Sequence, residues 1–162
     1  MSGDASGGKG VYTQTGGSLK DTAADSPLFY TTNSTGVITL KGVNVTEASG
    51  VLLKAAAGNW GTSGANGGNA VVTANAQTLA GSIVADKIST VSLTLKNGSS
   101  LTGAVNAANT AESVTGAKIS GTTITNIVGT GHTVTYDKSA AADSALGGKA
   151  YTLAGGGTLT PR

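Results

Sequence analysis

Apolar residues recur along this chain with two periods, a short one of two residues and a long one of about 22 residues. The short period is clearest where Val91, Leu93 and Leu95 alternate with hydroxyl-bearing residues. Successive side chains of a strand point to opposite faces, so this alternation predicts a β-strand with one buried face.

The long period is carried by three apolar series and one series of glycines. The apolar series are Leu79, Leu101 and Ile124; Ile83, Val105 and Val128; and Val71, Val91, Val114 and Val134; the glycines are Gly36, Gly58, Gly81 and Gly103. A fixed period carried by short β-branched runs predicts a β-solenoid in which successive coils stack on one another. The expected fold is therefore all-β, a single-stranded parallel β-helix with about 22 residues per coil.

The pattern divides the chain into three parts. Residues 1–10 form a Gly-rich flexible segment, 11–136 the solenoid body, and 137–162 a C-terminal cap. The body is interrupted at 58–69, GNWGTSGANGGN, which we expect to project as an inserted loop. Within the cap, Leu146 before two glycines predicts a brief helical turn, and 151–153 and 158–159 predict returning strands.

Composition excludes several classes of protein. Of 162 residues, 26 are Gly, only 11% are charged and none is Cys. The chain is too apolar for intrinsic disorder, and without cysteine it has neither a disulfide framework nor a thiolate metal site. The net charge of +2, carried by scattered cations, gives no basic patch for nucleic acid, and no apolar run is long enough for membrane insertion.

The titratable residues do not form a motif that carries catalysis. The eight acids show no D-x-D or E-x-x-H spacing, and His132 is the only histidine. Asp137 and Ser139 lie near it in sequence, but no nucleophile elbow or oxyanion motif accompanies them. We therefore predict a protein that is not an enzyme, with no catalytic residues, cofactor or metal.

Thr-x-Thr occurs at 13–15, 123–125 and 133–135. This spacing lets a flat solenoid face display rows of hydroxyls to ice. Because the motif does not recur on every coil, we interpret these residues as ordinary outward threonines of strands, with ice binding as the less favoured alternative.

Two stretches resemble a known family. The run VLLKAAAGNWGTSGANGGNAVVTANAQTLAGSIVADKISTVSLTLKNGSSLTGAVN and the ending GHTVTYDKSAAADSALGGKAYTLAGGGTLTP are similar to bacterial secreted, adhesin-like proteins predicted to be right-handed parallel β-helices. The resemblance covers most of 11–161. It implies an extracellular, right-handed β-helix and supplies no catalytic residues; the usual twist and crossover preference favours the same hand.

These observations lead to two functional hypotheses. In the first, the chain is a structural or adhesive module that presents its loop to a carbohydrate or cell surface, with Trp60, Asn59 and Asn66 as contacts. In the second, copies stack end to end into a fibre through exposed terminal coils, and the edge of the open first coil is Val11, Tyr12, Thr13 and Gln14. Either role suits an extracellular or cell-surface location. Because 1–10 has no secretory signal pattern, we expect the chain to be part of a longer secreted protein.

Overall fold

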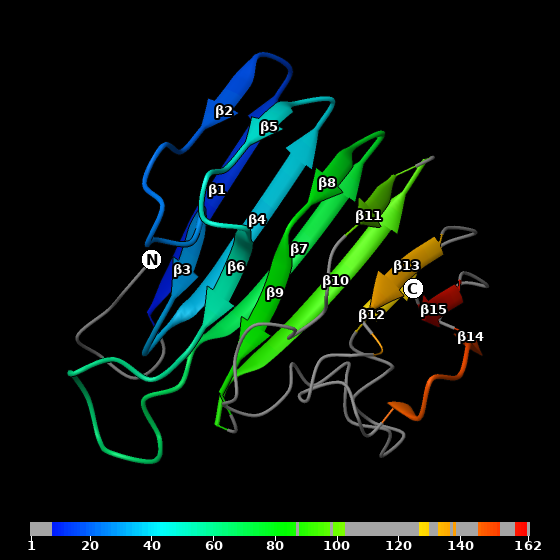
Figure 1. The fold of residues 1–162 in the computed structure, drawn as a ribbon. Coiled ribbons are helices and arrows are strands. Elements are labelled where there is room, and N and C mark those ends of the chain that lie inside the picture. The colour runs from blue at the N-terminus through cyan, green and yellow to red at the C-terminus, as the bar shows by residue number, and fades with distance from the viewer. Residues whose placement is uncertain are drawn as a thin grey trace.

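The structure is a computed structural model that describes residues 8–86, 88–97, 99–102, 127–129, 133–136, 138, 146–152 and 158–161. These residues are mostly β-strand with almost no helix (Figure 1). The strands are β1 (Lys9–Thr15), β2 (Ser18–Lys20), β3 (Phe29–Thr31), β4 (Thr35–Lys41), β5 (Asn44–Thr46), β6 (Val51–Ala55), β7 (Asn69–Asn75), β8 (Thr78–Ala80), β9 (Ser82–Ala85), β10 (Thr90–Lys96), β11 (Ser100–Thr102), β12 (Ile127–Gly129), β13 (Thr133–Tyr136), β14 (Tyr151–Thr152) and β15 (Thr158–Pro161).

The longest strands form one parallel sheet in the order β1-β4-β7-β10-β12. Neighbours pair over their full length from β1 to β10, so that Lys9 lies beside Thr35, Thr35 beside Asn69, and Asn69 beside Thr90. Figure 1 shows these strands side by side and nearly parallel. The backbone ladder of this sheet aligns strands that are far apart in sequence.

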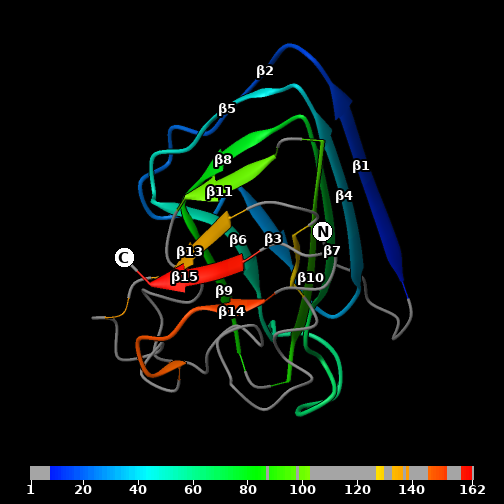
Figure 2. The same ribbon diagram turned by 90° about the vertical axis from the view of Figure 1, so that its right-hand side faces the viewer.

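The shorter strands build three further sheets, in the orders β2-β5, β3-β6-β9 and β14-β15-β13-β11-β8. All their pairings are parallel except that of β14 with β15. The chain thus passes from the long sheet through two short-strand sheets and back, and we call each such passage a circuit: β1–β3, β4–β6 and β7–β9. Figure 2 shows the long strands on one side of the molecule and the short strands on the other.

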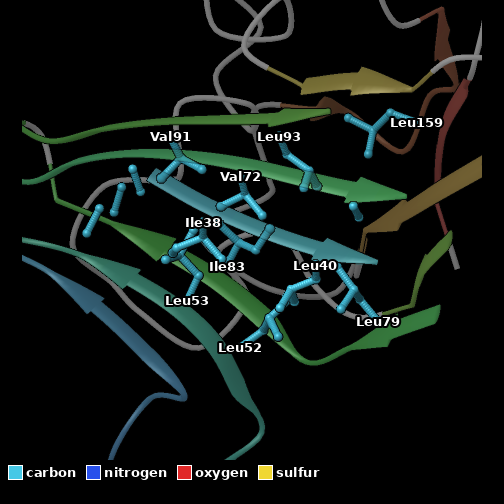
Figure 3. Close-up of a cluster of buried hydrophobic side chains, with 14 of the residues drawn as sticks. Ile38, Leu40, Leu52, Leu53, Val72, Leu79, Ile83, Val91, Leu93 and Leu159 are labelled. Atoms are coloured by element: carbon cyan, nitrogen blue, oxygen red, sulfur yellow. The ribbon is translucent and has the colours of Figure 1, made fainter. Parts of the chain in front are cut away.

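The hydrophobic core lies between these sheets. Alternate residues of the long strands point inward, such as Ile38 and Leu40 of β4 and Leu93 of β10, each at most 1% exposed. They pack against side chains of the short strands, including Leu53 and Ile83 (Figure 3). The predicted inside-outside alternation at 91–95 is confirmed at the two apolar positions whose burial is described, Val91 and Leu93.

The predicted long period of about 22 residues is confirmed in part. The predicted alignment of Leu79 with Leu101 is confirmed where β8 pairs with β11. The offset between paired residues is larger from β4 to β7, where Thr35 lies beside Asn69, because the predicted loop at 58–69 is inserted there between β6 and β7. The offset is also larger from β1 to β4, where Lys9 lies beside Thr35, and no insertion was predicted there. Loops at the corners absorb the difference in length, because only the strands need to stay in register.

Three predicted alignments also differ from the observed register. Leu101 pairs next with Val134 and not with Ile124. Val91 pairs with Ala70, one residue before the predicted partner Val71. Val128 lies in β12 of the long sheet, whereas Ile83, with which it was predicted to align, lies in β9 of another sheet. The glycine series does not mark a register either, since Gly36 pairs with Gly10 and Ala70.

Other predicted positions lie outside the described residues. They are Gly103, Val105, Val114, Ile124, His132, Asp137, Ser139 and the Thr-x-Thr at 123–125.

Buried polar side chains fasten one circuit to the next at the corners. Gln77, only 2% exposed, accepts a hydrogen bond from the backbone N–H of Val43 (2.8 Å) and donates one to its carbonyl (2.7 Å). Ser99 Oγ in turn accepts the backbone N–H of Gln77 at 3.1 Å. The side chains thereby satisfy buried backbone groups where the strands are interrupted.

The C-terminal strands β14 and β15 form an antiparallel pair at one edge of the sheet β14-β15-β13-β11-β8. The predicted turn at Leu146 is present, since Lys149 donates its N–H to the Leu146 carbonyl (3.2 Å) and Gly147 and Gly148 are left-handed. Leu146 and Leu159 are fully buried in the core cluster. The strands predicted at 151–153 and 158–159 correspond to β14 and β15, with 153 outside the described residues.

We predict that Leu40→Ala lowers the free energy of unfolding by about 2–5 kcal/mol, because a cavity replaces a fully buried side chain. Lys41→Ala, at the exposed neighbouring position, is the matched control and should change it by less than about 0.5 kcal/mol. Urea unfolding followed by circular dichroism measures both. Equal effects of the two variants would contradict the assignment of the inner face.

Candidate functional site

The outer edge of β1 is the first candidate site. Thr35 donates its N–H to the Gly8 carbonyl and Gly16 donates its N–H to the Lys41 carbonyl, both at 2.8 Å. In a regular parallel ladder these bonds place the even-numbered residues of β1 in hydrogen bonds with β4. The backbone groups of the odd-numbered residues, including Val11 and Thr13, therefore point away from β4. Among the described strands, none pairs with β1 on that side.

An apolar hollow of about 330 Å³ lies beside this edge. It is lined by Val11, Tyr12, Leu19, Leu28, Phe29, Tyr30 and Ile38. The lining residues come from all three strands of the first circuit, from Leu28 just before β3, and from Ile38 of β4. The hollow is therefore an end of the hydrophobic core that no strand in the described part of the chain covers.

The four predicted edge residues divide into two pairs. Val11 is 64% exposed and Thr13 is exposed, so these side chains face outward. Tyr12 and Gln14 are half-buried, and the Tyr12 hydroxyl donates a hydrogen bond to Gln14 Oε1. Tyr12 also packs edge to face on Phe29, with ring centroids 5.5 Å apart. Val11 and Tyr12 thus line the hollow, whereas Thr13 and Gln14 continue the strand edge beyond it.

The loop at 58–69 is the second candidate site. Asn66, 7% exposed, donates hydrogen bonds from Nδ2 to the carbonyls of Gly58 (2.8 Å) and Trp60 (3.0 Å). Its own carbonyl accepts the backbone N–H of Asn33 at 3.2 Å, which ties the loop to the corner after β3. Asn66 therefore fastens the loop from within.

Trp60 and Asn59 lie on the outside of this loop. The Trp60 side chain is 67% exposed, and Asn59 is exposed beside it. Holding so large an apolar ring in water on a fastened loop has a solvation cost, which is typical of a contact surface. The structure thus brings Asn59 and Trp60 to the surface and places Asn66 beneath them. The ligand contacts themselves stay a prediction.

Two of the described carboxylates, Asp86 and Glu47, accept hydrogen bonds from backbone N–H groups. Asp86 accepts the N–H groups of Ala57 at 2.7 Å and Ile88 at 3.2 Å, and Glu47 accepts that of Gly50 at 2.6 Å. Over the part of the chain that the structure describes, no group of three or more His, Asp or Glu residues could hold a metal. These acids therefore act as caps of turns.

No described helix has the length and apolar character needed to cross a bilayer. Comparison of the chain with family models, with curated proteins and with solved structures gives no match.

Sequence reasoning missed the structural roles of Asn66 and Gln77. Asn66 bonds to carbonyls within its own loop, whereas Gln77 reaches Val43 in the preceding circuit. An amide residue beside glycines signals a turn, but it does not reveal which carbonyls the side chain reaches.

We predict that Asn66→Ala raises the rate of chymotryptic cleavage after Trp60 about tenfold. The loop loses two hydrogen bonds from a buried amide, worth about 0.5–1.5 kcal/mol each, and opens more often. Asn59→Ala, in the same loop but exposed, should leave the rate within about twofold. A similar rise in both variants would contradict the fastening role of Asn66.

Proposed function

We propose that this chain is a non-catalytic structural module with a right-handed parallel β-helix fold, and that its open first circuit binds the first circuit of a second copy. The observation that carries the proposal is the outer edge of β1 beside an apolar hollow of about 330 Å³.

The repeated circuits support the β-helix. Each of the three circuits begins in the long sheet and continues through two short strands. β4 returns beside β1, β7 beside β4, β5 beside β2, β6 beside β3 and β9 beside β6, all with parallel pairing, whereas β8 pairs with β11 in a separate sheet. Such returns are the arrangement expected of a solenoid, in which each coil contacts only its neighbours. The right hand follows from the preference of parallel crossover connections.

Strand addition at β1 is supported by the free backbone groups of its odd-numbered residues. An exposed strand edge offers N–H and C=O groups that pair readily with another chain. The adjoining hollow adds an apolar surface that association would remove from water, at roughly 25 cal/mol per Å². Main-chain hydrogen bonds and burial would thus act together, as in other cases of β-augmentation.

A second copy fits this edge better than an unrelated chain. It brings an equal hollow, so both uncovered core ends are closed in one contact. A two-fold axis at Tyr12 would pair two β1 strands antiparallel, with Lys9 opposite Thr15 of the second copy. Lys9 is the only charged residue of β1, so this arrangement keeps the two cations at opposite ends of the pair.

The exposure of Trp60 favours a second function, display of the loop to carbohydrate. Its ring offers a flat apolar surface, and the neighbouring Asn59 offers amide groups for hydrogen bonds with hydroxyls. The adhesin-like relationship and the extracellular or cell-surface location suit both functions and stay predictions.

We predict that the chain forms a dimer that dissociates on dilution, and that Thr13→Pro weakens it at least tenfold. Proline removes an N–H that points away from β4, so the β1–β4 ladder keeps its hydrogen bonds. Sedimentation velocity across a concentration series measures the dissociation constant, and circular dichroism reports retention of the fold.

Two lysine variants provide the matched comparison. Val11→Lys places a charge at the rim of the open edge and should also weaken the dimer, whereas Val37→Lys places it at the paired position of β4 and should not. A chain that is monomeric at all concentrations, or a dimer that is insensitive to both edge variants, would refute assembly through β1.

For the display function, we predict that Trp60→Ala abolishes binding to any glycan that the chain retains on a glycan array. Ile88→Ala removes another exposed apolar side chain outside the loop and serves as the control. Binding that survives Trp60→Ala, or no binding by the unmodified chain, would count against this function.

A further inference from the structure

The outer face of the long sheet carries ordered rows of side chains, of which only the members on β1 border the proposed dimer contact. In β4 and β7 every second residue is buried, and the residues between them point outward. Because β1, β4, β7 and β10 pair in register, their outward side chains align across the sheet. We call this surface the ladder face. In Figure 2 no described strand covers it.

The two central rows of the ladder face consist of hydroxyl and methyl groups. One row is Thr13, Thr39, Thr73 and Thr94, and the adjacent row is Val11, Val37, Val71 and Ser92. Within a row, neighbours lie about 4.7–4.9 Å apart, and the two rows are about 6.6–6.8 Å apart along the strands. The face is therefore a two-dimensional lattice with nearly constant spacing.

The marginal rows are tied by side-chain hydrogen bonds. Thr90 donates its hydroxyl to Asn69 Oδ1 at 2.7 Å, and Asn69 donates from Nδ2 to Thr35 Oγ1 at 3.4 Å. On the opposite margin, Asn97 donates from Nδ2 to Asn75 Oδ1 at 2.8 Å. These bonds hold the margins in place before any ligand arrives, which lowers the entropic cost of binding.

The central hydroxyls keep their hydrogen-bonding capacity. Among the described residues, no hydrogen bond involves the side-chain hydroxyl of Thr13, Thr39, Thr73 or Thr94. The charged residues of these four strands, Lys9, Lys41 and Lys96, all lie at strand ends. The centre of the ladder face is thus neutral, regular and available to a ligand.

We infer that the ladder face binds the surface of an ice crystal. The repeat within each row is close to the separation of water oxygens along the a axis of hexagonal ice, so each hydroxyl can take the place of a lattice water. The intervening methyl groups order the water between them without accepting hydrogen bonds. A neutral face also matches a neutral crystal surface, whereas charged groups would retain disordered hydration shells.

The size of the ladder face argues against a protein partner. Four strands of this length cover about 400 Å². A stable protein interface needs roughly 800 Å² on each partner. Binding to ice requires no such minimum area, because the affinity for the crystal grows with the number of side chains that match its lattice positions.

Ice binding was the less favoured interpretation of Thr-x-Thr because the motif is not repeated on every coil. The relevant repeat runs across the strands, since one threonine from each of β1, β4, β7 and β10 builds the row. Of the two motifs with described residues, 13–15 contributes to the row through Thr13, whereas 133–135 lies in β13 of another sheet.

The test is adsorption of the fluorescently labelled chain to a growing ice hemisphere, together with inhibition of ice recrystallisation. The unmodified chain should adsorb and inhibit. Thr39→Tyr and Thr73→Tyr each place a tall ring at the centre of the ladder face and should raise the inhibitory concentration at least tenfold. Tyrosine suits an exposed strand position, so the fold should persist, as circular dichroism will show.

Thr46→Tyr provides the matched control, because Thr46 is an exposed threonine of β5 on another sheet. It should keep full activity. Absence of adsorption by the unmodified chain, or equal loss of activity in Thr46→Tyr, would overturn the inference. Binding to crystalline cellulose or chitin without binding to ice would overturn it as well and would assign the face to a polysaccharide surface.

Discussion

The in-register backbone ladder of the long sheet is the constraint on which the other features depend. Each return of the chain must place a whole strand beside that of the preceding circuit, from Lys9–Thr15 to Thr90–Lys96. A shift by one residue would turn every buried side chain to solvent. The ladder thereby fixes the core on one face, the ordered rows on the other, and the open edge where the series of strands begins.

Local features of the fold could be predicted from the sequence, but the spacing of the circuits could not. Alternation identified the strand around Leu93, and Leu146 before two glycines identified the turn that follows it. The predicted insertion at 58–69 accounts for the long circuit from β4 to β7, but the longer circuit from β1 to β4 was not predicted, because corner loops differ in length from one circuit to the next. The physical restraint acts on the strands alone, so apolar residues such as Val71 and Val91 coincided with the period without being aligned.

The candidate sites were predicted only in part. The edge at Val11 and the exposed Trp60 followed from local pattern, because each lies beside Gly-rich sequence that ends regular pairing. The hollow next to β1 depends on side chains from separate strands, such as Phe29 and Ile38, that meet only in the folded chain. The role of Asn66 depends on which carbonyls its side chain reaches in the folded loop, and the threonine rows depend on how the strands pair, so neither could be read from the order of residues alone.

The most direct test of the account is disulfide formation between engineered cysteines, since the chain has none of its own. Thr39→Cys with Thr73→Cys places two thiols on adjacent strands, about 4.8 Å apart at Cα, within the range that a disulfide spans. Thr39→Cys with Thr94→Cys places them two strands apart, beyond that range. The register predicts rapid intramolecular oxidation of the first pair and none of the second. Oxidation of the second pair, or of neither, would contradict it.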